Sequence, residues 1–326
     1  LMFITSFGEQ NITYKCCSNF LIHLSHSASI WGLTDLLQYA NQQVLSTDKA
    51  SIKVTHWRES HGNMIKTWDS HEAVSCSINF IIVPPSFEAP VSQEGAQNYS
   101  QWIEQHYKNG AVLCSICSGI FTLLETKLFS GRTVTTHWLN NEIVNARFPD
   151  VVIDSNKIIV DDPDLITTAG IMSWMDLGLK LVERIYSTPF MIEFSKLLLI
   201  DPPSREQSYY KNFTPNFSHG DTAIIKIQHW LQNNYEKKIT VDDLAEMANL
   251  EKRTLLRRFK KATGLAPIEY CQNLRIHKAQ DLLLTTNMSF DSISWQVGYK
   301  DSSSFNKIFV KTIGLTSTEY RKRFIS

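Results

Sequence analysis

The sequence predicts two domains of different fold class: an α/β domain built on a parallel sheet, followed by an all-α domain with two helix-turn-helix units. A fourteen-residue pattern occurs twice near the C-terminus, at 257–270 and 307–320, and each copy follows a short segment with helical periodicity. Before residue 200, short apolar runs alternate with longer helical patterns. This alternation is typical of a parallel sheet covered by helices on both faces.

The N-terminal elements follow one another along the chain. Apolar runs predict strands at 19–24, 51–57, 78–83 and 111–116, and apolar residues at helical spacing predict helices at 29–43, 93–108 and 118–127. Residues 151–169 predict a hairpin and one further strand, and helices are expected at 173–187 and 189–200. The polar, proline-containing stretch 201–219 predicts a linker between a domain at 1–200 and a domain at 220–326.

The two copies of the C-terminal pattern align without a gap. Six positions are identical: Phe259/Phe309, Lys261/Lys311, Gly264/Gly314, Leu265/Leu315, Glu269/Glu319 and Tyr270/Tyr320. Before each copy, a hydroxyl residue followed by an acid marks a helix N-terminus, at Thr240 and at Ser289. Two short helices, the second of them basic, joined by a tight turn make a helix-turn-helix. Residues 267–286 predict a long helix that joins the two units, with Pro267 in its first turn.

Charge divides the chain in the same way. Residues 220–326 carry 17 Lys and Arg against 11 Asp and Glu, and residues 1–219 carry 15 against 21, so the net charges are +6 and −6. A basic domain with helix-turn-helix units suits a partner that is a polyanion. The six cysteines show no zinc-type or secreted-framework spacing, which predicts no metal and a reducing cytoplasm. We expect no membrane span and no leader, and Leu1 is not a natural start, so a few residues are expected to precede it.

Cys117 stands where a buried strand runs straight into a helix, in the sequence Ile116-Cys-Ser-Gly119. This is the layout of a nucleophile elbow, in which the side chain at the turn lies near the N–H groups of the next helix. A helix N-terminus favours the thiolate, so we expect a lowered pKa for Cys117. The alternative is a small apolar residue at a crowded turn. His137 is the candidate partner, with capping or packing as its alternative, and Cys114 with Cys117 forms a CxxC that could act as a redox switch.

Both halves resemble known families. Residues 220–326 resemble the DNA-binding domain of AraC-type transcription regulators, through the run Phe259-Lys-Lys-Ala-Thr-Gly-Leu-Ala-Pro267 and the second copy of the repeat. Residues 19–200 resemble the PfpI-like, class I glutamine amidotransferase-like fold, through 116–123, 128–138 and Thr168-Ala-Gly170. The order of these motifs resembles GlxA-type regulators of the AraC family. The resemblance implies a flavodoxin-like sheet, and enzymes of the superfamily use the elbow cysteine.

Two departures from the enzymes of that superfamily predict that the domain is not catalytic. The enzymes place an acid three residues before a glycine of the first helix, and here the matching position before Gly32 is Ser29, while Asp35 lies on the other side. The glycine pair that often helps to form the oxyanion site is replaced by Val83-Pro-Pro85, and proline has no N–H to donate. Cys117 and His137 are then vestigial candidates. The alternatives are a hydrolase or hydratase with Cys117 as nucleophile, or a thiol-based redox sensor.

A ligand pocket is expected in the crevice beside Cys117. Ligands of open α/β sheets bind at such crevices, and aromatic walls can hold a cation. The predicted lining residues are Trp31, Cys117, Ser118, His137, Trp138, Gly170 and Trp174. Some regulators of this layout respond to amino acids or quaternary amines, so the resemblance implies an effector of that kind. Ordinary core packing is the alternative for each tryptophan.

The second helix of each helix-turn-helix is expected to enter the major groove of double-stranded DNA, with its N-terminal side chains at the base edges. The predicted base-reading residues are Arg253, Thr254 and Arg257 in the first unit and Ser303, Ser304 and Lys307 in the second. Lys252, Arg258, Lys260 and Lys261 are predicted phosphate contacts, with a solvated helix face as the alternative. The shorter side chains of the second unit predict weaker base discrimination there.

The sequence therefore predicts a cytoplasmic bacterial transcription regulator, associated with the nucleoid when it is bound to promoter sites. A small-molecule effector and a homodimer are expected, with RNA polymerase as a further partner of an activator. No cofactor is expected.

Overall fold

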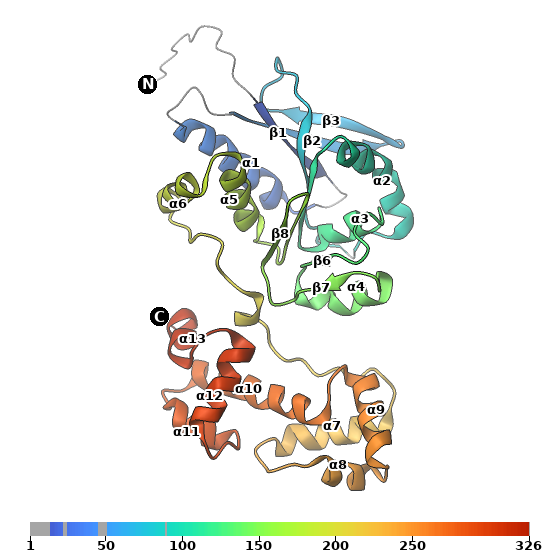
Figure 1. The fold of residues 1–326 in the computed structure, drawn as a ribbon, viewed down its shortest axis with the longest axis vertical. Coiled ribbons are helices and arrows are strands. Elements are labelled where there is room, and N and C mark those ends of the chain that lie inside the picture. Colours follow the sequence, from blue (N-terminus) through green and yellow to red (C-terminus); the bar gives the residue numbers. More distant parts are fainter. Residues whose placement is uncertain (1–13, 22–24, 45–50, 89, 326) are drawn as a thin grey trace. The chain divides into compact units, whose positions relative to one another are not determined.

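The computed structural model describes residues 14–21, 25–44, 51–88 and 90–325 (Figure 1). The chain divides into two compact units, Leu1–Gln207 and Ser208–Ser326. The division falls inside the segment 201–219. That this segment works as a linker stays a prediction, but its residues are packed: Gln207 is buried and hydrogen-bonded in the first unit, and Phe213 packs on Tyr270 in the second.

The first unit is built on a seven-stranded sheet with the order β3-β2-β1-β4-β5-β9-β8. The pairs β1–β2, β1–β4, β4–β5 and β5–β9 are parallel, and the edge strands β3 and β8 are antiparallel to their neighbours. The seven strands are β1 (Tyr14–Leu21), β2 (Ser51–Ser60), β3 (Asn63–Asp69), β4 (Ile78–Val83), β5 (Val112–Ile116), β8 (Ile159–Asp162) and β9 (Leu165–Thr168). A separate parallel pair is formed by β6 (Thr133–Val134) and β7 (Val152–Ile153).

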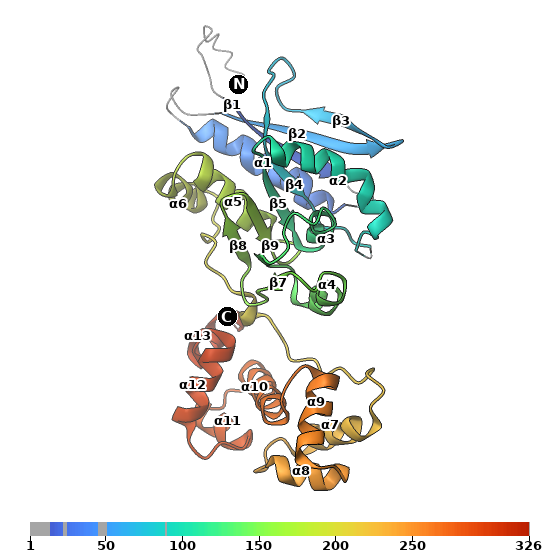
Figure 2. The ribbon, with the colours of Figure 1, turned by 45° about the vertical axis from the view of Figure 1, so that its right-hand side comes forward.

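Helices cover both faces of this sheet, as Figures 1 and 2 show. Strand side chains alternate between two cores: Phe80 and Ile82 of β4 join one cluster and Ile81 and Val83 the other. The first cluster is covered by α1 (Ser27–Gln43), α5 (Trp174–Ile185) and α6 (Thr188–Leu197), and the second by α2 (Gln93–Lys108), α3 (Ile120–Leu124) and α4 (Asn141–Arg147). The predicted parallel α/β sheet is confirmed.

The structure corrects several boundaries in this unit. The strand predicted at 19–24 is β1, which begins five residues earlier at Tyr14 and ends at Leu21, and residues 22–24 lie outside the described part. The helix predicted at 118–127 is a short 3-10 turn, Cys117–Gly119, followed by a five-residue α3. The sequence reading also missed β3, which pairs with β2 across a turn at His61 and Gly62, both with positive φ. Strand prediction depends on a regular alternation of apolar and polar residues. The residues of β3 are mostly exposed and do not show that alternation.

The second unit consists of helices around two cores, one for each helix-turn-helix. The first helix-turn-helix comprises α8 (Val241–Ala248) and α9 (Lys252–Thr263), and the second helix-turn-helix comprises α11 (Phe290–Gln296) and α12 (Ser302–Ile313). The long helix α10 (Pro267–Thr285) joins them, and α7 (Thr222–Asn234) and α13 (Ser317–Phe324) complete the domain. The all-α fold is as predicted, while α7 lies before the repeat and was not predicted.

The identical positions of the repeat have the same structural role in both copies. Phe259 and Phe309 are fully buried. Gly264 and Gly314 end their helices at φ +77° and +85°, in the left-handed region that favours glycine. Tyr270 and Tyr320 each accept a hydrogen bond of 3.2 Å from a buried glutamine amide, Gln228 and Gln280. The predicted caps are also present: the N–H of Asp243 donates to Thr240 Oγ1 and the N–H of Ser292 donates to Ser289 Oγ.

Candidate functional site

Cys117 sits in a strained turn at the end of β5. Its φ is +51°, in the left-handed region that non-glycine residues rarely adopt. The turn is held by a close backbone approach at Gly119, where a Cβ would lie 2.3 Å from the carbonyl oxygen of Val83. The predicted elbow geometry is therefore present, with the 3-10 turn and α3 directly after the cysteine.

The surroundings of the Cys117 thiol raise its pKa, and the expectation of a lowered pKa is wrong. The sulfur accepts hydrogen bonds from the backbone N–H groups of Ser118, Gly170 and His137, which favour the thiolate. Burial is the larger effect and raises the pKa, because the charged form loses its water. Cys114 is fully buried, and burial raises its pKa as well. A CxxC pair of this kind lacks the exposed, low-pKa sulfur that a dithiol switch uses.

His137 is brought next to Cys117 through the backbone, and its ring is engaged in a local cap. Its Nδ1 accepts a hydrogen bond of 3.2 Å from the N–H of Leu139, and its ring packs 4.0 Å from that of Trp138. Burial lowers the pKa of His137, so the neutral imidazole is favoured. Thr136 donates from Oγ1 to the carbonyl oxygen of Cys117 at 2.9 Å. The segment 136–138 is thus tied to the elbow.

The position of the superfamily's acid is occupied by the Ser29 hydroxyl. Ser29 is buried, its Oγ lies 2.7 Å from Nδ1 of His26, and it donates to the carbonyl oxygen of Ile171 at 3.4 Å. In place of an oxyanion donor, Pro85 accepts a hydrogen bond at its carbonyl from the N–H of His26. The carboxylate that would exchange a proton with Cys117 is therefore replaced by a hydroxyl that is bonded elsewhere.

The predicted lining residues are only partly gathered around the cysteine. Trp174 packs against the same core cluster as Cys117, with its ring on Gly32, and its buried Nε1 has no hydrogen-bond partner among the described residues. Ser118 Oγ accepts from the N–H of Ser86 at 3.1 Å. The ring of Trp31 packs on His56 of β2 and Trp68 of β3, and its place in the predicted lining stays a prediction.

A cavity of about 220 Å³ lies on the α2 side of the elbow. Ser118 and Thr122 line it from the elbow and α3, and Tyr99 lines it from α2. Cys117 is not among its lining residues. The hydroxyl of Thr122 is buried and has no hydrogen-bond partner among the described residues.

Gln207 is a site residue that the sequence did not indicate. Its amide nitrogen donates to Thr135 Oγ1 and to the carbonyl oxygens of Thr136 and Lys157, and its Oε1 accepts from the N–H of Trp138. The last described residue of the first unit is therefore bonded to the segment that contacts Cys117. These contacts span 50 to 72 residues of sequence, so no local pattern could reveal them.

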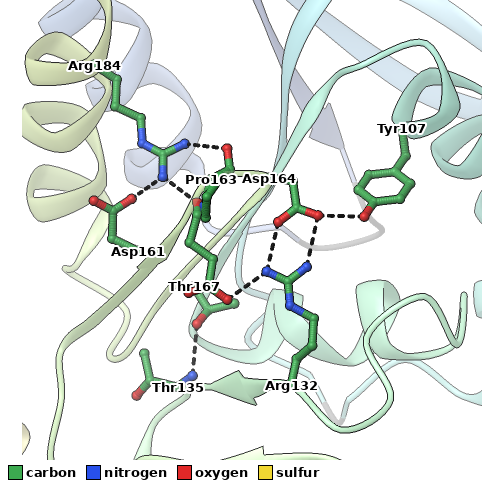
Figure 3. A network of polar contacts seen from close by, with 9 residues as sticks. Tyr107, Arg132, Thr135, Asp161, Pro163, Asp164, Thr167 and Arg184 are labelled. Atoms are coloured by element: carbon green, nitrogen blue, oxygen red, sulfur yellow. Dashed lines mark hydrogen bonds and ion pairs between the residues drawn. The ribbon is translucent and has the colours of Figure 1, made fainter.

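The same segment is anchored from its other side by an ion-pair network, shown in Figure 3. Arg132 donates to both carboxylate oxygens of Asp164, which also accepts from the hydroxyl of Tyr107 at 2.6 Å. The hydrogen bonds from Arg132 lower the pKa of Asp164 to about 2. The N–H of Thr135 donates to Thr167 Oγ1 of β9 at 2.8 Å. The residues 132–138 are thus fixed against the sheet.

In the second unit, α9 presents a basic face opposite its core. Leu255 and Phe259 are buried, while Arg253, Arg257 and Lys260 are exposed on the opposite side of the helix. Neither Arg253 nor Arg257 pairs with a described acid. Both guanidinium groups are therefore exposed on the outer face of α9.

Two predicted phosphate contacts, Lys252 and Arg258, are paired with acids of the same domain, and Lys252 Nζ lies 3.0 Å from Oδ1 of Asp242. Arg258 makes the closer, bidentate pair. Its guanidinium donates from Nε and from a terminal nitrogen to the two oxygens of Asp221, at 2.9 and 2.7 Å. Asp221 caps α7, so this bidentate pair ties α9 to α7. Arg258 is engaged within the domain because it lies on the side of α9 that faces α7.

In α12 the predicted reading residues are less free. Asp301 caps the helix: it accepts from the N–H groups of Ser303 and Ser304 and from the Ser304 hydroxyl. Ser303, Ser304 and Lys307 are all exposed, and the hydroxyl of Ser304 is engaged by Asp301. Leu256 in α9 is 37% exposed, and the matching position of α12 holds the half-buried Asn306.

Two helix-turn-helix units joined by one long helix, following in sequence a flavodoxin-like domain with an elbow cysteine, define a transcription regulator with a ligand-binding type of N-terminal domain. Residues 19–184 match the DJ-1/PfpI family and residues 244–323 match a helix-turn-helix domain family. The chain belongs to the DJ-1/PfpI family, and it is an AraC-type DNA-binding regulator.

The relatives of this chain agree with that class. It is similar to the HTH-type transcriptional regulator ArgR of Pseudomonas aeruginosa, with 25% identity over 76% of this chain and 74% of the relative. It is also similar to the lactose operon transcription activator of Staphylococcus xylosus, with 41% identity over 58% of this chain and 68% of the relative. Among solved structures it is similar to an AraC family transcriptional regulator from Pseudomonas putida, with 16% identity, a TM-score of 0.45, and coverage of 56% of this chain and 99% of that one.

Neither a metal site nor a membrane helix is found in the described part of the chain. No three His, Cys, Asp or Glu side chains there gather as metal ligands. Among the helices at 25–44, 51–88 and 90–325, none is long and apolar enough to cross a bilayer.

Proposed function

We propose that the first unit binds a small-molecule effector at the Cys117 elbow without turning it over, and that effector binding alters DNA recognition by the second unit. The carrying observation is the elbow itself: a strained cysteine lies among three backbone donors, Ser29 replaces the acid, and burial raises the thiol pKa. Backbone donors of this kind suit a ligand held by hydrogen bonds, while a thiol with a raised pKa does not supply the thiolate that covalent chemistry uses.

Thiol alkylation against pH tests the non-catalytic assignment. The rate at Cys117, followed by mass spectrometry on the intact chain, is expected to rise with a midpoint above the ordinary thiol value of about 9. Cys117→Ala identifies the modified peptide, and the half-exposed Cys76 serves as an internal reference. A midpoint well below neutrality, together with hydrolysis or hydration that disappears in Cys117→Ala, would support an enzyme instead.

The effector is proposed to be an amino acid or a quaternary amine that carries a carboxylate. The buried Trp174 N–H without a partner supports a ligand that accepts a hydrogen bond. The Trp138 ring beside His137 supports a cationic group, since an indole face attracts cations.

Calorimetric titration of the full chain with a panel of amino acids and betaines tests the effector class. Trp174→Phe keeps the ring and removes the N–H, and it is expected to weaken binding about tenfold, the effect of one lost hydrogen bond to a charged group. Trp102→Phe, on the opposite core, is the matched control and should bind normally. Equal affinities of the wild type and Trp174→Phe would remove Trp174 from the pocket.

The DNA contacts are proposed to come from Arg253, Thr254, Arg257 and Lys260 in the first helix-turn-helix and Ser303 and Lys307 in the second. Exposure of Arg253 and Arg257 opposite the core of α9 supports this assignment. Arg257→Ala should abolish specific footprints on promoter DNA while the first unit stays folded. An intact footprint would contradict the assignment.

The remaining partners are also proposed: a homodimer formed through the first unit, RNA polymerase if the protein activates, and a cytoplasmic, nucleoid-associated location. Sedimentation of the full chain with and without effector tests the dimer. A monomer under both conditions at micromolar concentration would contradict it.

A further inference from the structure

We propose that residues 208–217, the first segment of the second unit, form a strap that positions the two helix-turn-helix units relative to each other on DNA. Tyr209, Tyr210 and Phe213 are its positioning residues. The proposal rests on the proposed use of both units in DNA reading, and it assigns to this segment a role beyond that of a linker.

The first end of the strap is fastened to the second helix-turn-helix. The ring of Tyr209 lies so close to Gly314 that a Cβ there would be 2.9 Å from its Cε1 atom. The guanidinium of Arg323 lies 5.2 Å from the centre of the same ring, within reach of a cation–π contact. Tyr210 packs edge-on against Phe324 at 5.6 Å, and its hydroxyl accepts from Arg323 at 3.4 Å. Both tyrosines thus contact the helix end at Gly314 or the α13 helix.

The other end of the strap is fastened to the first helix-turn-helix. Phe213 meets the ring of Tyr270 edge-on at 5.0 Å, and Phe217 stacks on His229 of α7 at 4.8 Å. The buried amide of Gln228 donates to the carbonyl oxygen of Asn216 and also to the hydroxyl of Tyr270. A single stretch of ten residues is therefore attached to both units of the repeat.

This double attachment matters because the two helix-turn-helix units have separate hydrophobic cores. One cluster surrounds Phe259 and the other surrounds Phe309, and the helix α10 runs between them. Apart from α10, the units meet at the end of α7, where Arg275 donates to the carbonyl oxygen of Tyr235 at 2.6 Å and Gly298 closely approaches the carbonyl of Glu236. The strap adds a third connection between the two helix-turn-helix units. Two reading helices bind one DNA face well only when their spacing and angle match the groove.

The strap also begins next to the elbow's anchor. Gln207, the residue before it, is bonded to Thr135, Thr136 and Trp138 in the first unit. A shift of the segment 135–138 on effector binding would therefore pull on the residue that precedes Tyr209.

The test uses the full-length protein and measures its preference for the spacing between two DNA boxes. A two-box site is first selected from random duplexes with the wild type, and a series is then made with the boxes one base pair closer, unchanged, and one base pair further apart. A duplex with one box scrambled measures binding through a single unit. The variants are Tyr209→Ala with Tyr210→Ala, and the conservative pair Tyr209→Phe with Tyr210→Phe.

The alanine pair is expected to lose about tenfold in affinity for the preferred two-box duplex and to bind the three spacings nearly equally, because a loosened joint removes most of the benefit of linkage. Its affinity for the one-box duplex should stay within about twofold of the wild type. The phenylalanine pair keeps the ring contacts and should keep the spacing preference.

Other outcomes overturn the proposal in distinguishable ways. An unchanged spacing preference in the alanine pair, or an equal loss on the one-box and two-box duplexes, would show that the strap does not position the units. Selection that yields no enriched site with the wild type would contradict the proposed DNA reading itself. A melting temperature of the alanine pair equal to that of the phenylalanine pair excludes misfolding as the cause of a change.

Discussion

The two helix-turn-helix units have the same frame and different reading surfaces. Phe259 and Phe309 fill equivalent core positions, and Gly264 and Gly314 end the second helices in the same left-handed conformation. The outward positions differ: Arg253, Leu256, Arg257 and Lys260 in α9 correspond to Ser303, Asn306, Lys307 and Val310 in α12. The two copies therefore have identical residues where core packing and backbone geometry require them, and different residues where the side chains face outward.

The largest effect expected from this comparison is on stability, and it should be equal in the two units. Phe259→Ala and Phe309→Ala each remove a fully buried ring from its cluster, which typically costs about 3–5 kcal/mol of unfolding free energy. Denaturant unfolding followed by helical circular dichroism measures the loss. A cost in one unit that is several times smaller than in the other would show that the two frames are not equivalent.

A smaller and unequal effect is expected on DNA binding. Arg257→Ala removes a guanidinium that can form a bidentate pair with guanine, worth about 1–3 kcal/mol of discrimination. Lys307→Ala, at the matching position, should weaken binding on all sequences alike and lower the slope of affinity against salt by about one. Electrophoretic titration over a salt series separates the two patterns. Loss of base preference in Lys307→Ala as large as that in Arg257→Ala would make the units equal readers.

The uncharged pair Leu256 and Asn306 gives a sharper comparison of base choice. An exposed apolar side chain suits a thymine methyl group, and an asparagine amide can pair with adenine, at about 1–3 kcal/mol for a good bidentate contact. We predict that Leu256→Ala relaxes the selected sequence at a thymine of the first box. Asn306→Ala should relax it at an adenine of the second box. Repeated selection with each variant measures this, and unchanged consensus sequences would show that neither side chain reaches a base.

The smallest expected effect concerns the repeated glutamates. Glu319 accepts from the N–H and hydroxyl of Thr316 at 2.8 and 2.7 Å, while the matching bond from Ala266 to Glu269 is 3.5 Å long. Glu319→Gln should therefore lower the melting temperature more than Glu269→Gln.

The pH dependence of that difference follows from the pKa of Glu319. The hydrogen bonds from Thr316 lower it below its ordinary value of 4.5, so Glu319 stabilises the folded state above that pH. This stabilisation is lost as the pH falls through the lowered pKa. The two variants should thus converge with the wild type in acid. A difference that persists below pH 3 would point to a cause other than the carboxylate.

At the elbow, the local sequence predicted the backbone geometry correctly and the pKa of the thiol incorrectly. The strand-turn-helix pattern at Cys117 predicted the geometry, and the structure has it at φ +51°. The pKa of the Cys117 thiol is raised and not lowered, because the effect of burial is larger than that of the hydrogen bonds from backbone N–H groups. A local pattern gives the order of residue types along the chain. The exclusion of water from the Cys117 sulfur depends on segments that are distant in sequence, such as 135–138 and 170–174.

By itself the sequence determined the parallel sheet, the double helix-turn-helix, the caps at Thr240 and Ser289 and the identity of the repeated core residues. These features depend on side-chain periodicity and on contacts within a few residues, so they can be read locally. Only the tertiary structure decided that Arg258 is paired with Asp221, that Gln207 is bonded beside the elbow, that Trp31 packs on His56, and that residues 208–217 contact both helix-turn-helix units. Each of these depends on hydrogen bonds or packing between residues far apart in sequence, which exist only once the chain has folded.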